Sequence, residues 1–192
     1  MKKEALHIYL FIHGQTNFNR DGRFTGWLDS RLTFLGKKQA GMIAKKLKNK
    51  KFQIAFYTRL MRSQETLAPV LKFHPECEKL IKDDRMIERN YGLLNGKTHE
   101  EFIKKYGEEM YNKVHRGFDT RPPKGESFAM VEKRVGKFIK FLIPYMKKHK
   151  VSVAISAHGN SIRLFRKIIE KKSREQAVKW AIPYDDYFEY RI

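Results

Sequence analysis

The stretch from Val151 to Ile162, VSVAISAHGNSI, decides the fold because one secondary-structure pattern gives way to another within it. Residues 151–157 are apolar and rich in β-branched side chains, which is typical of a buried strand. Residues 160–171 then repeat apolar side chains at helical spacing. The apolar residues on that face are Ile162, Phe165, Ile168 and Ile169. A strand that passes directly into a helix indicates an α/β protein.

A second strand, near the N-terminus, ends in the same way. Residues 6–12, LHIYLFI, form an apolar run that is followed by His13 and Gly14. The predicted strand at 151–157 is followed by the same pair, His158 and Gly159. None of the other five histidines precedes a glycine. Parallel strands bring their carboxyl ends to one edge of a sheet, where ligands bind in such folds. Glycine also allows backbone to approach an anion closely. Both histidines are therefore candidates for an anion-binding functional site.

The rest of the chain continues to alternate strands with helices. Further strands are predicted over 53–58 and 187–191. Further helices are predicted over 33–48, 60–72, 100–111 and 126–148, with Pro69 expected to kink or shorten the second of these. A long loop is expected over 13–32, another loop over 117–126, and mostly irregular chain or short strand over 75–99. The pattern predicts a three-layer α/β/α fold with a mostly parallel central sheet.

Length and composition restrict the class of protein. The 192 residues contain no repeat or long linker, so we expect a single domain over residues 1–192. No apolar run approaches the roughly 20 residues that a membrane helix needs, and no membrane partner is expected. The one cysteine, Cys77, excludes an internal disulfide framework and fits a cytoplasmic protein.

The chain is strongly basic, with a formal net charge of +20. The lysines are spread along the sequence, without zinc-ligand spacing or an aromatic–basic RNA motif beside them. A solvated basic surface therefore explains the charge better than a specific nucleic-acid partner, although such a surface still attracts a small phosphorylated metabolite. A homodimer is a possible assembly.

Several short motifs follow one another along nearly the whole chain. They are IHGQT at 12–16, RFTGWLD at 23–29, TRLMR at 58–62, ERNYG at 88–92, RGF at 116–118 and AHGNSIR at 157–163. In this order they resemble the histidine phosphatase superfamily, and their details are similar to its cofactor-dependent phosphoglycerate mutase branch. The resemblance implies interconversion of 3-phosphoglycerate and 2-phosphoglycerate, with 2,3-bisphosphoglycerate as the priming phosphoryl donor and no metal.

The resemblance also implies catalytic roles for four residues. His13 would attack a phosphoryl group and become phosphohistidine, as a neutral imidazole can do near pH 7. Arg62 and His158 would stabilise the charge on the transferred group. Glu88 would act as general acid and base. The substrate-binding residues implied are Asn19, Thr25, Gly26, Tyr91, Arg116, Gly159 and Asn160.

Each of these residues also has a plainer interpretation when taken alone. Arg62 could be a surface arginine on a helix, and Glu88 could pair with a neighbouring arginine. Tyr91 and Trp27 could be core or pocket-wall packing. His13 and His158 lack the additional ligands at metal-binding spacing that a zinc site requires.

The chain departs from the family signature at its most sensitive position, where Ile12 replaces the arginine that precedes the nucleophile. Loss of one preorganised donor costs on the order of 3–4 kcal/mol in the transition state. Three interpretations stay open: a compensating cation, a weak or inactive homologue, or an engineered or sequencing change. The candidate compensating cations are Arg20, Arg23 and Arg163.

Other departures affect the choice of reaction. His115 stands where mutases have an arginine, and His99 lies near an expected lysine, with Lys97 close by. The segment after Pro123 is also shorter than in long mutases. A more open site favours hydrolysis of phosphohistidine, so a small-molecule phosphomonoesterase is the alternative. An inactive protein that senses a phosphorylated metabolite is a further alternative, and Ile12 is its main support.

Overall fold

The computed structural model describes residues 5–192 and contains a five-stranded sheet in the order β3-β2-β4-β1-β5. The strands are β1 (His7–Ile12), β2 (Ile54–Tyr57), β3 (Lys79–Lys82), β4 (Val153–Ala157) and β5 (Tyr187–Arg191). Neighbouring strands among β1 to β4 are parallel, and β5 pairs antiparallel with β1 at one edge. The sheet is therefore mostly parallel, as predicted.

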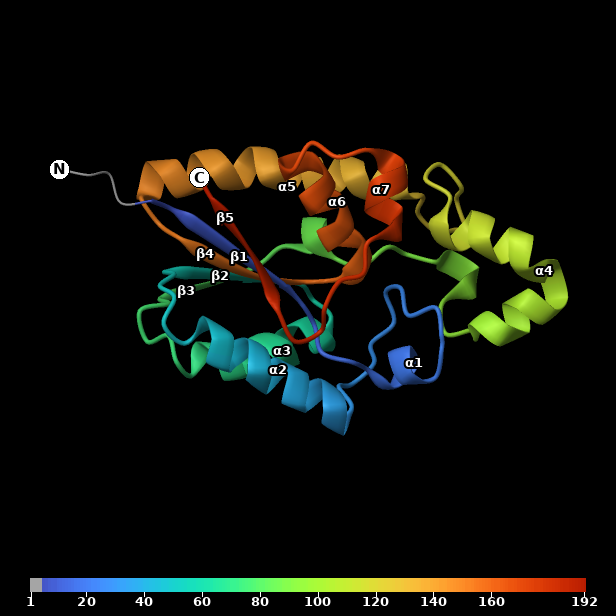
Figure 1. The fold of residues 1–192 in the computed structure, drawn as a ribbon, viewed down its shortest axis with the longest axis horizontal. Helices are drawn as coiled ribbons and strands as arrows, with labels where there is room; N and C mark the ends of the chain where they lie inside the picture. The colour runs from blue at the N-terminus through green and yellow to red at the C-terminus, as the bar shows by residue number, and fades with distance from the viewer. Residues whose placement is uncertain (1–4) are drawn as a thin grey trace.

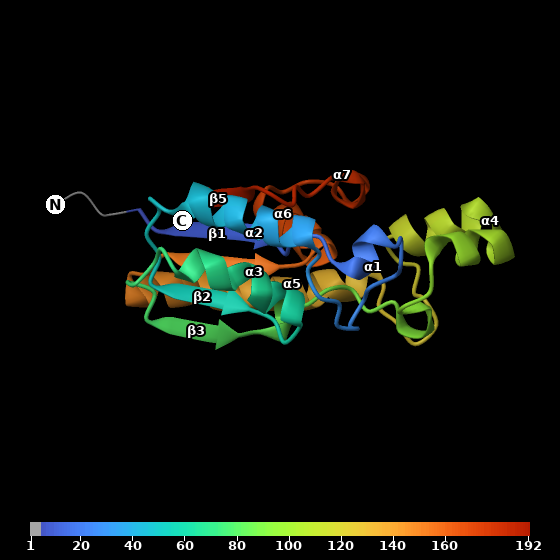
Figure 2. The ribbon, with the colours of Figure 1, turned by 90° about the horizontal axis from the view of Figure 1, so that it is seen from below.

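Helices cover both faces of this sheet, which confirms the three-layer α/β/α arrangement (Figures 1 and 2). One layer contains α2 and α3, and the other contains α5 and α6. The helices are α1 (Asn17–Arg20), α2 (Phe34–Leu47), α3 (Met61–Leu71), α4 (His99–Arg116), α5 (Phe128–His149), α6 (Gly159–Ile169) and α7 (Arg174–Lys179), with short 3₁₀ turns η1 (Asp84–Met86) and η2 (Gly92–Leu94). Within residues 5–192, no helix is long and apolar enough to cross a membrane.

Strand β1 contributes to a separate core on each side of the sheet, because successive side chains of a strand point to opposite faces. Ile8, Leu10 and Ile12 pack in the core formed with α5 and α6. Tyr9 and Phe11 pack in the core formed with α2 and α3. Because the side chains alternate, Ile12 at the end of β1 lies on the face of the sheet that α5 and α6 cover.

The observed elements differ from the predicted ones in four places. The long loop after β1 contains α1, and α7 was not predicted. Helix α4 continues to Arg116, with a kink at Gly107, where φ is 81°. Pro69 lies in the last turn of α3, which ends at Leu71, so the proline does not interrupt the body of that helix. Figure 1 shows α4 projecting from one end of the molecule, beyond the carboxyl ends of the parallel strands.

Candidate active site

The two histidines that follow strands lie side by side at the carboxyl edge of the sheet. Ile12 of β1 pairs with Ala157 of β4, so the next residues of both strands leave the sheet together. The backbone N–H of His13 donates to the carbonyl of Ala157 at 3.2 Å, and the rings of His13 and His158 are 5.1 Å apart between centroids. Both side chains are buried.

The tautomer of His13 follows from its two hydrogen bonds. Its Nδ1 lies 2.8 Å from the carbonyl oxygen of Gly14, which can only accept, so Nδ1 carries the proton. Its Nε2 then holds the lone pair and accepts from Nε of Arg62 at 3.2 Å. Burial, followed by the charge of Arg62, lowers the pKa of His13 to about 3. At neutral pH the imidazole is therefore uncharged, with its lone pair on Nε2.

Arg62 lies at the start of α3 and is completely buried, with 0% of its surface exposed. Its two terminal nitrogens donate to the carbonyl oxygens of Gly26 and Leu28, each at 2.8 Å. Burial lowers the pKa of Arg62 to about 10, so the guanidinium stays charged at neutral pH. The interpretation of Arg62 as an ordinary surface arginine is wrong, because this cation lies in the interior beside the Nε2 atom of His13.

His158 is held in place by the hydroxyl of Thr58 at the end of β2, with Nε2 to Oγ1 at 2.8 Å. Its Nδ1 is buried and has no hydrogen-bond partner among residues 5–192. Burial lowers the pKa of His158 well below its ordinary value, and the charge of Arg62 acts in the same direction. The ring lies directly behind His13 and is not itself part of the cavity wall.

Glu88 is also buried, at 9% exposure, in the chain between η1 and η2. Its Oε1 accepts from the backbone N–H groups of Arg89 at 2.6 Å and Asn160 at 3.3 Å. The carboxylate does not pair with a neighbouring arginine, because Arg85 binds Asp83 and the guanidinium of Arg89 binds backbone carbonyls.

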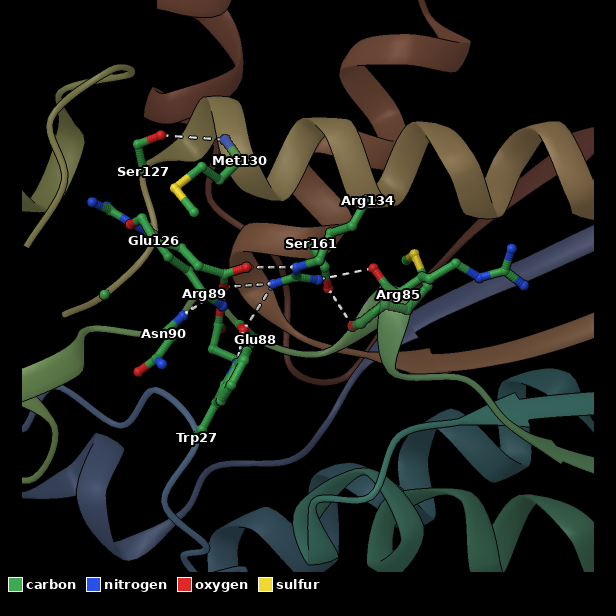
Figure 3. Close-up of polar contacts among 12 residues, drawn as sticks. Trp27, Arg85, Glu88, Arg89, Asn90, Glu126, Ser127, Met130, Arg134 and Ser161 are labelled. Atoms are coloured by element: carbon green, nitrogen blue, oxygen red, sulfur yellow. Dashed lines mark hydrogen bonds and ion pairs between the residues drawn. The ribbon is translucent and has the colours of Figure 1, made fainter.

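The backbone of Glu88 is fixed from two sides (Figure 3). Arg134 of α5 donates to the carbonyl oxygen of Glu88 at 2.9 Å and to that of Arg85 at 2.8 Å, and it forms an ion pair with Glu126. The indole N–H of Trp27 donates to the same carbonyl of Glu88 at 2.8 Å. Sequence reasoning did not single out Arg134, since its role depends on contacts across the fold.

A cavity of about 430 Å³ opens above this group. Its wall includes His13 and Glu88, and the predicted substrate-binding residues also lie on it. Those residues are Asn19, Thr25, Gly26, Tyr91, Arg116, Gly159 and Asn160. The amide of Asn160 donates to the hydroxyl of Tyr91 at 3.3 Å, so Tyr91 is a wall of the cavity. A glycine after His13 suggested that its backbone N–H could bind an anion. The N–H of Gly14 instead donates to the hydroxyl of Thr66 at 2.9 Å.

Several basic side chains line the cavity in addition to His13. Arg23, Arg116 and Arg163 line it together with His99 and His115. Burial, followed by the charge of Arg116, lowers the pKa of His115 to about 3. The positive charge of the cavity wall therefore comes from its arginines, which suits an anionic ligand.

Two features of the cavity wall were not predicted. Residues 179–182 and Tyr184 form part of the wall, so the chain before β5 covers the site. The ring of Tyr184 lies 6.4 Å from that of His13 between centroids. No periodicity or motif in this segment indicated the contact. Ile12 also lines the cavity, where the family signature has arginine.

A buried neutral histidine on the cavity wall, with a buried arginine and a second histidine packed behind it and a carboxylate on the same wall, defines a phosphoryl-transfer type of enzyme site. The sequence comparisons agree with this class. The model of the histidine phosphatase superfamily (branch 1) matches residues 8–189. The chain belongs to this superfamily of enzymes.

Two curated relatives carry mutase names. The chain is 36% identical over 179 residues to a 2,3-bisphosphoglycerate-dependent phosphoglycerate mutase 2 of Gloeobacter violaceus, covering 92% of this chain and 81% of the relative. It is also 36% identical over 176 residues to a 2,3-bisphosphoglycerate-dependent phosphoglycerate mutase of Mesorhizobium japonicum, covering 90% and 85%.

Solved structures with the same fold carry phosphatase names. A mycobacterial glucosyl-3-phosphoglycerate phosphatase superposes with a TM-score of 0.82 at 21% identity, over 97% of this chain and 90% of that one. An alpha-ribazole phosphatase from Shigella flexneri gives a TM-score of 0.82 at 21% identity, over 96% and 89%. At this identity the likeness establishes the fold alone.

Proposed function

We propose that this protein is a 2,3-bisphosphoglycerate-dependent phosphoglycerate mutase that interconverts 3-phosphoglycerate and 2-phosphoglycerate through phosphohistidine on His13. The arrangement that carries the proposal is the Nε2 lone pair of His13, 3.2 Å from the buried Arg62 guanidinium. The mutase names of relatives at 36% identity support the choice of substrate.

The nucleophile in this proposal is Nε2 of His13. The proton on Nδ1 stays with the carbonyl of Gly14 at 2.8 Å, which directs the lone pair of the other nitrogen toward the substrate. As the new P–N bond forms, the Arg62 donor that now contacts Nε2 turns to an oxygen of the phosphoryl group. His158, whose ring lies 5.1 Å from that of His13, would be a further polar partner of the phosphoryl group. These groups stabilise the charge that phosphoryl transfer spreads over the oxygens.

The acid and base in this proposal is Glu88. A protonated Glu88 would give its proton to the leaving oxygen as the P–O bond breaks, and the carboxylate would later take a proton from the incoming hydroxyl. The two backbone donors to Oε1 hold the carboxyl group in one orientation, which leaves Oε2 for the cavity. Arg134 keeps the backbone of Glu88 fixed.

The residues of the cavity fit 2,3-bisphosphoglycerate. Arg62, which contacts Nε2 of His13, and His158 behind it would turn to one phosphate, and Arg116 on the cavity wall would hold a second anionic group. When bound, this molecule supplies the phosphoryl group that first loads the histidine. The remaining basic groups of the cavity explain a preference for substrates with two anionic groups over simple monoesters.

A phosphomonoesterase is the second candidate, and one observation favours it. His115 is held neutral at the end of the cavity where mutases have an arginine, which weakens the grip on a second anion. A substrate held less firmly excludes water less completely, and water would then hydrolyse the phosphohistidine.

The proposal is tested by incubating the protein with 2,3-bisphosphoglycerate and locating phosphate by intact mass and peptide mapping, with 3-phosphoglycerate turnover measured in parallel. We expect phosphate on His13 and formation of 2-phosphoglycerate, both lost in His13→Ala. Exposed His149→Ala is the matched control and retains both. Release of inorganic phosphate without 2-phosphoglycerate would favour the phosphomonoesterase. Absence of label and turnover, with ligand-dependent thermal stabilisation retained, would indicate a metabolite-binding protein.

A further inference from the structure

The family signature has a positively charged arginine at position 12, where this chain has Ile12. The contacts around Gly159 show which side chains lie beside Ile12. A Cβ atom added to Gly159 would lie 3.6 Å from Cδ1 of Ile12 and 3.1 Å from Nη1 of Arg163. The same point lies 3.8 Å from Oε2 of Glu88. The end of the Ile12 side chain and the guanidinium of Arg163 therefore converge beside the carboxylate, on the wall of the cavity.

Arg163 is held rigidly without being neutralised. From one turn into α6, its Nε donates to the carbonyl of Trp180 at 2.9 Å, and its Nη1 donates to the side-chain carbonyl of Asn160 at 3.1 Å. Both partners are uncharged, and among residues 5–192 Arg163 forms no salt bridge. Burial, followed by the charge of Arg116, lowers the pKa of Arg163, while the charge of Glu88 acts in the opposite direction. A fixed cation that is not paired with an acid is a preorganised site for a substrate anion.

The other two candidate cations are placed differently. Arg20 forms an exposed ion pair with Asp21. Arg23 lines the cavity, but its Nη1 donates to the carbonyl of Gly96 at 2.7 Å, in the segment between η2 and α4. Of the three candidates, Arg163 is the one whose guanidinium approaches Gly159 together with the end of the Ile12 side chain.

We propose, resting on the proposed function, that Arg163 binds the transferred phosphoryl group and supplies the positive charge that the family signature assigns to residue 12. The covalent step is unchanged: the P–O bond of the donor breaks, the P–N bond to Nε2 of His13 forms, and Glu88 gives a proton to the leaving oxygen. Arg163 stabilises the oxygens of the group in transit. The apolar Ile12 side chain leaves the guanidinium of Arg163 as the cation beside Gly159.

The test is a double-mutant cycle on positions 12 and 163, made in the full-length protein. The readouts are the single-turnover rate of His13 phosphorylation by 2,3-bisphosphoglycerate and the inhibition constant of orthovanadate against p-nitrophenyl phosphate hydrolysis. We expect Arg163→Gln to lower the phosphorylation rate about a hundred- to a thousandfold. Adding Ile12→Arg to Arg163→Gln should restore the rate at least about tenfold, since the new guanidinium would occupy the same place. Arg163→Lys should retain part of the activity.

Arg166→Gln is the matched control. Arg166 lies on the same helix and packs on Trp180, 4.2 Å from the ring centroid, but it pairs with Glu170 and does not line the cavity. We expect it to leave both readouts within about threefold of the wild type. Unchanged phosphorylation in folded Arg163→Gln would overturn the proposal. A loss that Ile12→Arg does not restore would also overturn it, because it would assign Arg163 to holding Trp180.

The vanadate readout separates this proposal from the proposed function. If the wild type is not phosphorylated by 2,3-bisphosphoglycerate, the mutase proposal fails. A larger inhibition constant for vanadate in Arg163→Gln, lowered again by adding Ile12→Arg, would still support Arg163 as the phosphate-binding cation. An inhibition constant unchanged by Arg163→Gln would refute that assignment, whatever the physiological substrate.

Discussion

Arg62 carries its charge in the interior of the protein with neutral groups as its hydrogen-bond partners. They are Nε2 of His13 and two backbone carbonyls. Removing a guanidinium from water is costly, and burial lowers the pKa of Arg62 to about 10 for this reason. Since the charge has been desolvated already, an incoming phosphate gains its full attraction. The charge of Arg62 is thus positioned and desolvated before a phosphate binds, which provides part of the electrostatic stabilisation that phosphoryl transfer needs.

The role proposed for Glu88 gives a prediction that depends on the leaving group. Glu88→Gln keeps an acceptor oxygen for the N–H groups of Arg89 and Asn160 but removes the transferable proton. We expect kcat for 3-phosphoglycerate, which has a poor alkoxide leaving group, to fall about 10²- to 10⁴-fold. Hydrolysis of p-nitrophenyl phosphate should fall much less, because nitrophenolate leaves without protonation. Steady-state kinetics on both substrates measure the difference.

A matched carboxylate provides the control for this prediction. Glu132→Gln removes a carboxylate of α5 that pairs with Lys167, outside the cavity, and should leave both activities near the wild-type value. Equal losses on the two substrates in Glu88→Gln would contradict an acid role and assign Glu88 to structure.

The identity of the site residues could be predicted from motifs, but their environments could not. The motif at 58–62 indicated Arg62, yet its burial depends on carbonyls of Gly26 and Leu28, which belong to a distant loop. Sequence alone left three candidates for the compensating cation, because the choice depends on which side chain reaches Gly159. Tyr184 gave no signal, since its contact with the ring of His13 arises where the last loop crosses the site.

At the scale of elements, the start of α2 packs directly on the loop that carries His13. A Cβ atom at Gly14 would lie 2.2 Å from the carbonyl oxygen of Gly36, and one at Gly36 would lie 2.0 Å from that of Gln15. Backbone meets backbone here, and no side chain can turn aside to make room. Glycine at both positions therefore allows the helix to support the segment that follows the nucleophile.

This close approach predicts opposite effects for two glycines of the same helix. Gly36→Ala should destabilise the protein by about 1–3 kcal/mol, because its methyl group collides with the backbone of Gln15. Gly41→Ala, which meets nothing within 4 Å, should stabilise it by about 0.5–1 kcal/mol through helix propensity. Urea unfolding followed by circular dichroism measures both. Equal effects of the two substitutions would refute the contact.

Long elements could be predicted from the sequence and short ones could not. The apolar period of α5 extends over several turns, but α1 has four residues and α7 has six, too few for a period to appear. The sequence feature that could have indicated these two short helices is the pair of capping residues at the start of each. Thr16 with Asn19, and Ser173 with Gln176, form reciprocal capping interactions. Helix α4 was predicted over 100–111, through Gly107, but it extends from His99 to Arg116, with a kink at that glycine.

At the scale of the whole molecule, the excess of basic residues has a kinetic consequence. A net charge of +20 surrounds the protein with a positive potential, and the cavity adds Arg23, Arg116 and Arg163 at its wall. Such a field raises the rate at which phosphorylated anions arrive, an effect that salt reduces. The same field disfavours additional positive charge inside the protein, and the buried histidines are the groups that it affects.

Three of those histidines connect the site with the stability of the fold. The pKa values of His13 and His115 are lowered to about 3, and that of His158 is lowered well below its ordinary value, with burial as the largest cause for each. The unfolded chain takes up protons on these residues near pH 6.5, whereas the folded chain does not until far lower pH. The unfolded state therefore binds more protons as the pH falls, and acid favours unfolding.

We predict that the free energy of unfolding falls as pH decreases from about 6.5 toward 5, a range in which ordinary carboxylates titrate little. Each buried histidine contributes up to about 1.4 kcal/mol per pH unit, so three give a slope of up to about 4 kcal/mol per unit. Urea unfolding at closely spaced pH values measures it. His115→Gln should reduce the slope by about a third, whereas exposed His149→Gln should retain it. A slope that His115→Gln leaves unchanged would mean that His115 already binds its proton in the folded protein, and that the cavity is more hydrated than its geometry indicates.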